Sequence, residues 1–416
     1  MFETRGSCGA RVAERLTLDA SEVPSCEHCG RPATQYLLSA VPPFIFMGAM
    51  LERSGIAERL YRALQLWLGR LSGGLALATM LMAAIFAAST GIVGAVEVVI
   101  GMMAIPAMMR YRYDRSLIAG TICAGGSLGT MIPPSLVVVI YASVAQMSVG
   151  RLFAAMLLPA LIMVALFLGY IASRCWLRPA DGPPVPSPAE VPLAEKLRAT
   201  FTALVPATLL IVAVLGSIMF GIASPTEAAS VGAAGIVVLT ALYRRLGWRT
   251  LVETLRSTLL VNCMIMLIVT TGTMFSNIFR VHGGERLVGG AIGDLALDPS
   301  GMVALCLAIV FVAGFILDWV SIVLICLPIF LPILAGHGVD PIWFGVLMMI
   351  VIQTSYLTPP MAPSIFYLRS IAPPEIGYRH MYVGVAPYIV CQALVLVLVL
   401  AFPSLALYLP ASLARL

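Results

Sequence analysis

The sequence predicts an all-α polytopic membrane protein made of two related halves, and two observations carry this prediction. The 416-residue chain is 60% hydrophobic and only 11% charged, with a mean hydropathy of +0.99. Because soluble domains carry far more charge, this composition indicates on the order of ten membrane segments of roughly 20 residues each. The second observation is an internal offset of 226 residues that pairs interruptions in the apolar runs.

The charged residues exclude several classes of function. The net charge is +5, and the arginines gather in short loops such as 110–115 and 244–249. Loop arginines of this kind set membrane topology, so we expect no nucleic-acid partner. The chain has no HExxH motif and no acid pair beside a histidine, which disfavours a membrane-embedded enzyme.

Residues 1–37 form a polar leader that differs from the rest of the chain. Cys26 and Cys29 have a spacing typical of zinc ligands and Cys8 is available nearby, but a second ligand pair is missing. The leader also lacks the apolar core of a signal peptide. We therefore expect a disordered segment or a mis-assigned start rather than a zinc site.

The first transmembrane repeat is expected at 38–177. Its expected elements are a short apolar segment at 38–50, an amphipathic interfacial helix at 58–70, an apolar run at 75–109 and a span at 151–176. The stretch 125–135 between them is built to break a helix, because glycines loosen the backbone and two prolines remove N–H donors.

A proline-rich linker at 178–198 precedes the second repeat, expected at 199–410. Ser224 predicts a helix N-cap, with Pro225 in the first turn and Glu227 near the positive end of the helix. The expected spans run from about 200 to 222 and then over 228–243, 251–278, 300–317, 319–335, 341–356, 360–372 and 383–409.

Matching residues recur at one offset, which indicates an internal duplication. The pairs 226 residues apart are Pro106 and Pro332, Asp114 and Asp340, Pro133-Pro134 and Pro359-Pro360, and Tyr141 and Tyr367. Glu58-Arg59-Leu60 and Glu285-Arg286-Leu287 match at an offset of 227. The counterpart of 200–262 would start at position −26, before residue 1, so we expect the first copy to lack one or two leading helices.

The helix interruptions pair in the same way. Ser89–Gly91 and Gly129–Ser135 in the first half correspond to Gly314–Asp318 and Thr354–Met361 in the second. Broken helices are tolerated in lipid only where the freed backbone is covered, and paired breaks point to a transport site. Unwound carbonyls and hydroxyls can ligate Na⁺, and half-helix N-termini can face an anionic substrate.

Polar residues inside these apolar runs are candidate substrate-binding groups. Asp318 is either such a group or a helix cap. Glu97, within Val96–Val98, has no repeat support, so a structural role is favoured over a substrate or cation role. Arg369 could neutralise a carboxylate or be an interfacial arginine. Ser135, at the end of the first Pro-Pro break, completes the candidate substrate-binding set.

Several longer motifs follow one another in a fixed order. They are Val41–Gly48 (VPPFIFMG), Gly129–Ser135 (GTMIPPS), Ser224–Ala229 (SPTEAA), Gly314–Asp318 (GFILD) and Leu357–Pro360 (LTPP). At these motifs the chain resembles the large permease subunit of TRAP (tripartite ATP-independent periplasmic) transporters, the DctM-like family, over about residues 38–410. Phe366–Arg369 and Ala372–Glu375 look most similar to the branch named for mannitol, chloroaromatic or 2-oxo acid uptake.

The resemblance implies two inverted repeats in an elevator-type ion-transporter fold, and Na⁺-coupled uptake of an organic acid across the bacterial inner membrane. The implied partners are a small four-helix membrane subunit and a periplasmic substrate-binding protein. The implied Na⁺ ligands are Thr90, Gly91, Gly129, Ile132 and Pro133 in one site, and Gly314, Ser355, Thr358 and Met361 in the other. Ile92 and Val93 stand where the family often has serines, which weakens the first site.

One alternative from the same class stays open at this point, namely an elevator-type Na⁺/carboxylate symporter that works without a binding protein. Neighbouring genes for a four-helix membrane protein and a secreted binding protein would distinguish the two. The sequence names no substrate, because the binding protein selects it first.

Overall fold

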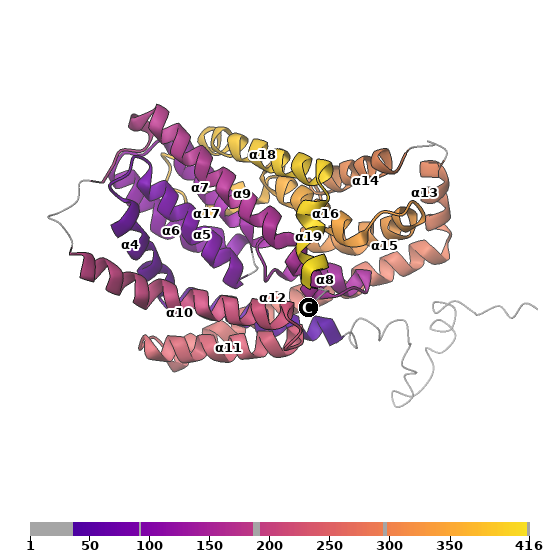
Figure 1. Ribbon diagram of the computed structural model, residues 1–416, viewed down its shortest axis with the longest axis horizontal. Coiled ribbons are helices and arrows are strands. Elements are labelled where there is room, and N and C mark those ends of the chain that lie inside the picture. The colour runs from indigo at the N-terminus through magenta and orange to yellow at the C-terminus, as the bar shows by residue number, and fades with distance from the viewer. Residues whose placement is uncertain (1–35, 91–92, 186–191, 294–297, 414–416) are drawn as a thin grey trace, which may run out of the picture.

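The computed structural model describes residues 36–90, 93–185, 192–293 and 298–413, and every regular element in these ranges is a helix (Figure 1). Most of the leader, with its three cysteines, lies outside the described residues, as does Gly91. The described helices that are long and apolar enough to cross a membrane are α9 (Val149–Leu177), α10 (Leu193–Met219), α11 (Pro225–Leu242), α12 (Trp248–Val281), α15 (Trp319–Gly336) and α18 (Tyr378–Ala401).

The other helices are shorter. Before α9 these are η1 (Tyr36–Ala40), α3 (Val41–Arg53), α4 (Ile56–Leu68), α5 (Gly74–Thr90), α6 (Val93–Arg110), α7 (Arg115–Ser127), η2 (Leu128–Thr130) and α8 (Leu136–Ala145). After α9 they are η3 (Pro179–Asp181), α13 (Gly284–Gly293), α14 (Pro299–Ala313), α16 (Pro341–Leu357), α17 (Pro363–Ile371) and α19 (Ser404–Leu413).

The helix bounds follow the internal repeat. Helices α6 and α15 begin and end 226 residues apart, and α7 and α16 begin 226 residues apart. Both α7 and α16 also begin with an aspartate N-cap. Asp114 and Asp340 accept hydrogen bonds from backbone N–H groups of the first helical turn. The duplication therefore extends from sequence motifs to helix bounds and caps.

The repeat-related helices α7 and α16 lie at the centre of the molecule. Every residue of α7 from Ser116 on, and every residue of α16 from Phe344 on, is buried. Helix α7 also packs closely on α18, because a Cβ on Gly120 would lie 2.1 Å from the carbonyl oxygen of Gly384. Small residues at such crossings let two membrane helices approach and gain dispersion energy.

Each repeat packs its short hairpin helix on the broken helix of the other repeat. Helix α8 contacts α15, and its counterpart α17 contacts α6. Around this centre, α10 and α11 run along one side (Figure 1). They and α12 expose large apolar side chains, such as Leu209, Val238 and Leu267. Such surfaces suit contact with lipid rather than water.

Several local expectations are confirmed. Ser224 caps α11 in a reciprocal capping box with Glu227, as the Ser-Pro-Thr-Glu pattern predicts. Helix α4 is amphipathic, with Leu60 buried and Arg62 exposed. Helix α5 ends at Thr90 and α6 begins at Val93, and the two residues between them lie outside the described residues, so the interruption at Ser89–Gly91 stays a prediction.

Three expected element bounds are wrong. The span expected at 360–372 is the 9-residue helix α17, because the Pro-Pro break extends to Ala362, whose φ of 40° lies in the left-handed region. The run expected at 383–409 divides into α18 and α19 around Phe402, since Pro403 cannot continue the hydrogen-bond ladder. Helix α10 begins at Leu193, inside the expected linker.

Candidate transport site

The first Pro-Pro break follows the buried end of α7. Helix α7 passes into the 3₁₀ turn η2, and α8 begins only after Ser135, whose backbone is extended. The Ser135 hydroxyl donates to the carbonyl oxygen of Thr130 at 3.1 Å, which bridges the break. Among the described residues, the carbonyls of Gly129, Ile132 and Pro133 accept no backbone hydrogen bond outside the helices. These carbonyls are therefore available to ligate a cation.

The second Pro-Pro break repeats this arrangement after α16. The Thr358 hydroxyl donates to the carbonyl oxygen of Thr354 at 2.7 Å, which leaves its lone pairs free to accept or to ligate. The carbonyls of Thr358 and Met361 accept no backbone hydrogen bond in the described chain outside the helices. Both Pro-Pro peptide bonds, Pro133-Pro134 and Pro359-Pro360, are cis.

Two of the residues implied as Na⁺ ligands in the second repeat are in direct contact. Gly314 follows α14, and a Cβ at this position would lie 2.2 Å from the Ser355 hydroxyl oxygen. Glycine is thus required where α14 meets the end of α16. The fold therefore brings the Gly314–Asp318 break and the Pro-Pro break together, although they lie far apart in the sequence.

The first-repeat set is described only in part. Thr90 is the last residue of α5, and its side chain lies outside the described residues together with Gly91. Among the described residues, no group of three His, Cys, Asp or Glu side chains converges. The donors present at the breaks are oxygen atoms of carbonyls and hydroxyls, which suit a hard cation such as Na⁺.

Glu97 on α6 is fully buried and joins the two repeats. Its Oε1 accepts a 2.6 Å hydrogen bond from Ser364 on α17, while Oε2 has no hydrogen-bond partner among the described groups. Gly126 lies against it, since a Cβ there would be 1.8 Å from the Glu97 Cγ. No ion pair within the described ranges includes Glu97. A buried carboxyl with one partner is costly to ionise.

The other candidate substrate-binding residues have local partners. Asp318 is the N-cap of α15, and its Oδ2 accepts from the Val320 N–H at 3.2 Å. The interpretation of Asp318 as a helix cap is therefore confirmed. The Arg369 guanidinium donates to the carbonyl oxygen of Ile376 at 3.2 Å and lies 5.5 Å from the centroid of the Tyr378 ring. Ser135 is the N-cap residue of α8.

A polar cluster at the centre was missed by the sequence analysis. Gln353 on α16 and Gln392 on α18 donate to the Ser127 hydroxyl at 3.2 and 3.4 Å. Ser127 has the Gly-x-Ser-x-Gly spacing of a hydrolase nucleophile, from Gly125 to Gly129. It lies at the end of a helix, donates to the Ala124 carbonyl at 2.8 Å and has no histidine among these partners. Ser127 is therefore a structural residue.

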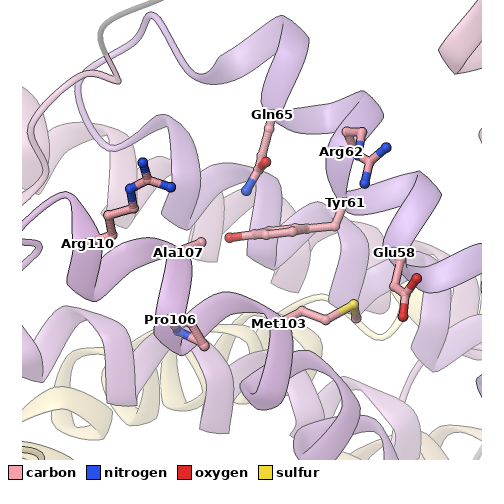
Figure 2. A pocket seen from close by; sticks show the side chains of 8 residues that line it. All are labelled: Glu58, Tyr61, Arg62, Gln65, Met103, Pro106, Ala107 and Arg110. Atoms are coloured by element: carbon pink, nitrogen blue, oxygen red, sulfur yellow. The ribbon is translucent and has the colours of Figure 1, made fainter.

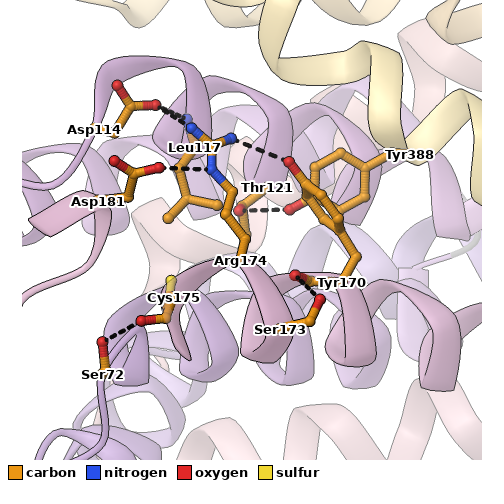
Figure 3. Close-up of polar contacts among 10 residues, drawn as sticks. All are labelled: Ser72, Asp114, Leu117, Thr121, Tyr170, Ser173, Arg174, Cys175, Asp181 and Tyr388. Atoms are coloured by element: carbon orange, nitrogen blue, oxygen red, sulfur yellow. Dashed lines mark hydrogen bonds and ion pairs between the residues drawn. The ribbon is translucent and has the colours of Figure 1, made fainter. Parts of the chain in front are cut away.

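A second missed cluster holds the start of α7. Figure 3 shows the Arg174 guanidinium of α9 facing both Asp114 and Asp181, with ion-pair distances of 2.8 and 2.9 Å. The same guanidinium donates to the Tyr170 hydroxyl at 3.0 Å. The 226-residue offset could not indicate this cluster, because the counterpart of Arg174 is Leu400.

Comparisons with known proteins agree with this architecture. A family model described as "Tripartite ATP-independent periplasmic transporter, DctM component" matches residues 14–405. The C4-dicarboxylate TRAP transporter large permease protein DctM of Pseudomonas aeruginosa is 30% identical over 378 residues, which are 90% of this chain and 86% of that protein. The ectoine/5-hydroxyectoine TRAP transporter large permease protein UehC of Ruegeria pomeroyi is 30% identical over 380 residues, 91% of this chain and 86% of that protein.

A solved structure shows the same fold at low sequence identity. MtrF of Neisseria gonorrhoeae aligns with a TM-score of 0.62 at 15% identity, covering 90% of this chain and 82% of that one. The repeats, the paired helix breaks and the family match over most of the sequence lead to one conclusion. The chain belongs to the DctM family of TRAP transporter large permeases.

Proposed function

We propose that this chain is the large transmembrane subunit of a Na⁺-coupled, binding-protein-dependent secondary transporter that imports an organic acid, such as a 2-oxo acid. As a DctM-family member it is a multi-pass protein of the bacterial inner membrane, and the family consists of transporter permeases rather than enzymes. A small four-helix membrane subunit and a periplasmic substrate-binding protein complete the proposed complex, since its relatives are named as TRAP transporter large permeases.

The observation that supports Na⁺ coupling is the pair of breaks, whose carbonyl oxygens accept no backbone hydrogen bond outside the helices in the described part of the chain. The proposed ligands are Thr90, Gly91, Gly129, Ile132 and Pro133 for one Na⁺, and Gly314, Ser355, Thr358 and Met361 for the other. The contact of Gly314 with Ser355 and the free carbonyls of both breaks support this assignment. A bound Na⁺ would supply positive charge beside the substrate.

The substrate is proposed to be an anion, because a helix N-terminus directly follows the first Pro-Pro break. Ser135 precedes α8 without capping it through its side chain, and N–H groups at such an end attract negative charge. At α15, by contrast, the Asp318 carboxylate already accepts from the Val320 N–H. Arg369 is the proposed cation for the carboxylate, and Glu97 is proposed to position α6 against α17. The two relatives named for C4-dicarboxylate and for ectoine are equally similar, so similarity does not choose between substrates.

Reconstituted uptake tests this proposal. The protein is placed in proteoliposomes with its small subunit and binding protein, and uptake of a labelled 2-oxo acid is followed with a Na⁺ or a K⁺ gradient. We expect uptake only with Na⁺ and only with the binding protein. Uptake that ignores Na⁺ would refute the ligand assignment, and Na⁺-driven uptake without the binding protein would favour the stand-alone symporter.

A matched pair of threonine variants locates the cation site. Thr358→Ala removes a proposed ligand hydroxyl, whereas Thr271→Ala removes an equivalent hydroxyl that donates to the Leu267 carbonyl at 2.8 Å on α12. We expect Thr358→Ala to raise the Na⁺ concentration at half-maximal uptake about tenfold, since 1.4 kcal/mol corresponds to that factor. Thr271→Ala should leave it unchanged.

A further inference from the structure

A pocket between α4 and α6 lies apart from the helix breaks. Its volume is about 390 Å³, and Figure 2 shows the side chains that surround it. The lining residues are Glu58, Tyr61, Arg62, Gln65, Met103, Pro106, Ala107 and Arg110. None of them belongs to the proposed Na⁺ or substrate sets, so the pocket needs a separate explanation.

The pocket has a polar end and an apolar wall. Figure 2 shows the Tyr61 hydroxyl, the Gln65 amide and the Arg110 guanidinium toward one end, and Arg62 and Glu58 toward the other. The α6 side supplies Met103, Pro106 and Ala107, which have no charged atoms. A lining of this kind fits an amphiphile with a charged head and an apolar stem better than it fits a free ion.

The charge of the lining favours an anion. Two arginines and one glutamate give a net charge of +1, and neither Arg62 nor Arg110 belongs to an ion pair within the described ranges. A guanidinium presents a planar set of donors that matches phosphate oxygens. One negative charge on the ligand would neutralise the pocket.

The position of the pocket suits a lipid headgroup. Arg110 ends α6, Arg112 lies in the loop after it, and Arg115 begins α7. A second arginine-rich loop, from the α11–α12 turn, lies against α4, since the Arg59 guanidinium is 4.6 Å from the centroid of the Tyr243 ring and Arg245 lies next to Gly55. Loops rich in arginine mark the cytoplasmic side, and basic pockets between helices on that side bind anionic headgroups.

We propose that this pocket binds the phosphodiester headgroup of an anionic phospholipid of the cytoplasmic leaflet, such as phosphatidylglycerol. The phosphodiester lies at the Arg110, Gln65 and Tyr61 end, and the glycerol stem lies along Met103 and Ala107. The lipid then links the amphipathic helix α4 to the end of the broken helix α6. This site is independent of the proposed Na⁺ coupling.

Thermal unfolding of the purified full-length protein in detergent tests the proposal. The probes are phosphatidylglycerol, phosphatidylcholine with the same acyl chains, and inorganic phosphate. We expect phosphatidylglycerol alone to raise the Tm in a saturable manner. An equal rise with phosphatidylcholine would overturn the charge argument, and an equal rise with inorganic phosphate would show an anion site without lipid.

Variants place the effect in the pocket. Arg110→Gln should weaken the apparent phosphatidylglycerol affinity at least about tenfold. Arg110→Lys should weaken it less, and so should Arg62→Gln, because Arg62 lies at the other end of the pocket. Glu58→Gln should strengthen it. Arg70→Gln is the matched control, because Arg70 is exposed just beyond α4 and outside the lining. Equal losses for Arg70→Gln and Arg110→Gln would overturn the site. If phosphatidylglycerol no longer raises the Tm when the small subunit is co-purified, the lipid proposal is overturned, because the small subunit then occupies the pocket.

Discussion

Gln353 donates a hydrogen bond from its side-chain amide to the Ser127 hydroxyl at 3.2 Å, and the two residues are 226 positions apart, which is the offset of the repeat. Each is therefore the counterpart of the other. In a two-fold arrangement, a residue contacts its own counterpart only close to the axis. This contact places the axis between the repeats at the buried ends of α7 and α16, directly before both Pro-Pro breaks.

The Ser127 cluster is expected to stabilise the interface of the repeats. Ser127→Ala would leave the buried amides of Gln353 and Gln392 without this acceptor, so we expect a loss of about 1–3 kcal/mol of unfolding free energy. Denaturant unfolding in mild detergent measures the loss. A double-mutant cycle with Gln353→Leu should show coupling, and additive effects would mean that the contact contributes nothing.

The close contact between Gly314 and Ser355 predicts an unusual rescue. Gly314→Ala should abolish Na⁺-driven uptake, because its Cβ would lie 2.2 Å from the Ser355 oxygen. The corresponding pair in the first repeat is Ala88 and Gly129. We therefore expect the double variant Gly314→Ala/Ser355→Gly to restore the fold, as judged by thermal unfolding.

The control for this prediction is Gly216→Ala on α10, where an added Cβ meets nothing within 4 Å. It should leave both folding and uptake intact. The packing explanation fails if Gly314→Ala is as harmless as Gly216→Ala, or if the double variant is no more stable than the single one.

The Glu97–Ser364 contact predicts different effects for two substitutions. Glu97→Gln keeps the shape of the side chain and an acceptor for Ser364 while it removes the cost of a buried charge, so stability should be unchanged or higher. Ser364→Ala removes the partner of Oε1 and should cost about 1–3 kcal/mol. Chemical denaturation of both variants checks the signs. A marked loss for Glu97→Gln would show that the ionised carboxylate has a structural partner.

The Arg174 cluster is expected to hold the start of α7. Arg174→Met leaves Asp114 and Asp181 without their cation. Both ion pairs are partly exposed to solvent, which screens them, so a loss of about 1–3 kcal/mol is expected. Asp114→Asn should cost less, since asparagine still caps the helix. Arg249→Gln is the control, because its pair with Glu253 is exposed and should contribute little. Equal Tm shifts for Arg174→Met and Arg249→Gln would contradict this role.

Much of the fold follows from properties that are local in the sequence. Hydropathy identifies the membrane class because a span needs only a continuous apolar run. The Asp114 and Asp340 caps and the Ser224 capping box depend on residues within one helical turn, so their patterns predict helix starts directly. The 226-residue offset then pairs the Pro-Pro breaks without any knowledge of packing.

The candidate site was predicted less completely, because its members meet through helix packing. Asp318 could be read as a functional group or as a cap, and only the structure shows its bond to the Val320 N–H. Glu97 lacked repeat support, and only the packing of α17 on α6 brings Ser364 to it across 267 residues. Hydropathy cannot set the rotation of one helix against another.

The class of this protein, the duplication and the approximate positions of the helix breaks can be predicted from the amino-acid sequence, because each depends on local composition or on a fixed spacing. Which breaks lie together depends on the packing of the helices. That packing brings Gly314 against Ser355, Ser127 against Gln353 and Arg174 against Asp114 and Asp181. These contacts depend on how whole helices cross and pack, and a free energy summed over many apolar contacts sets that geometry.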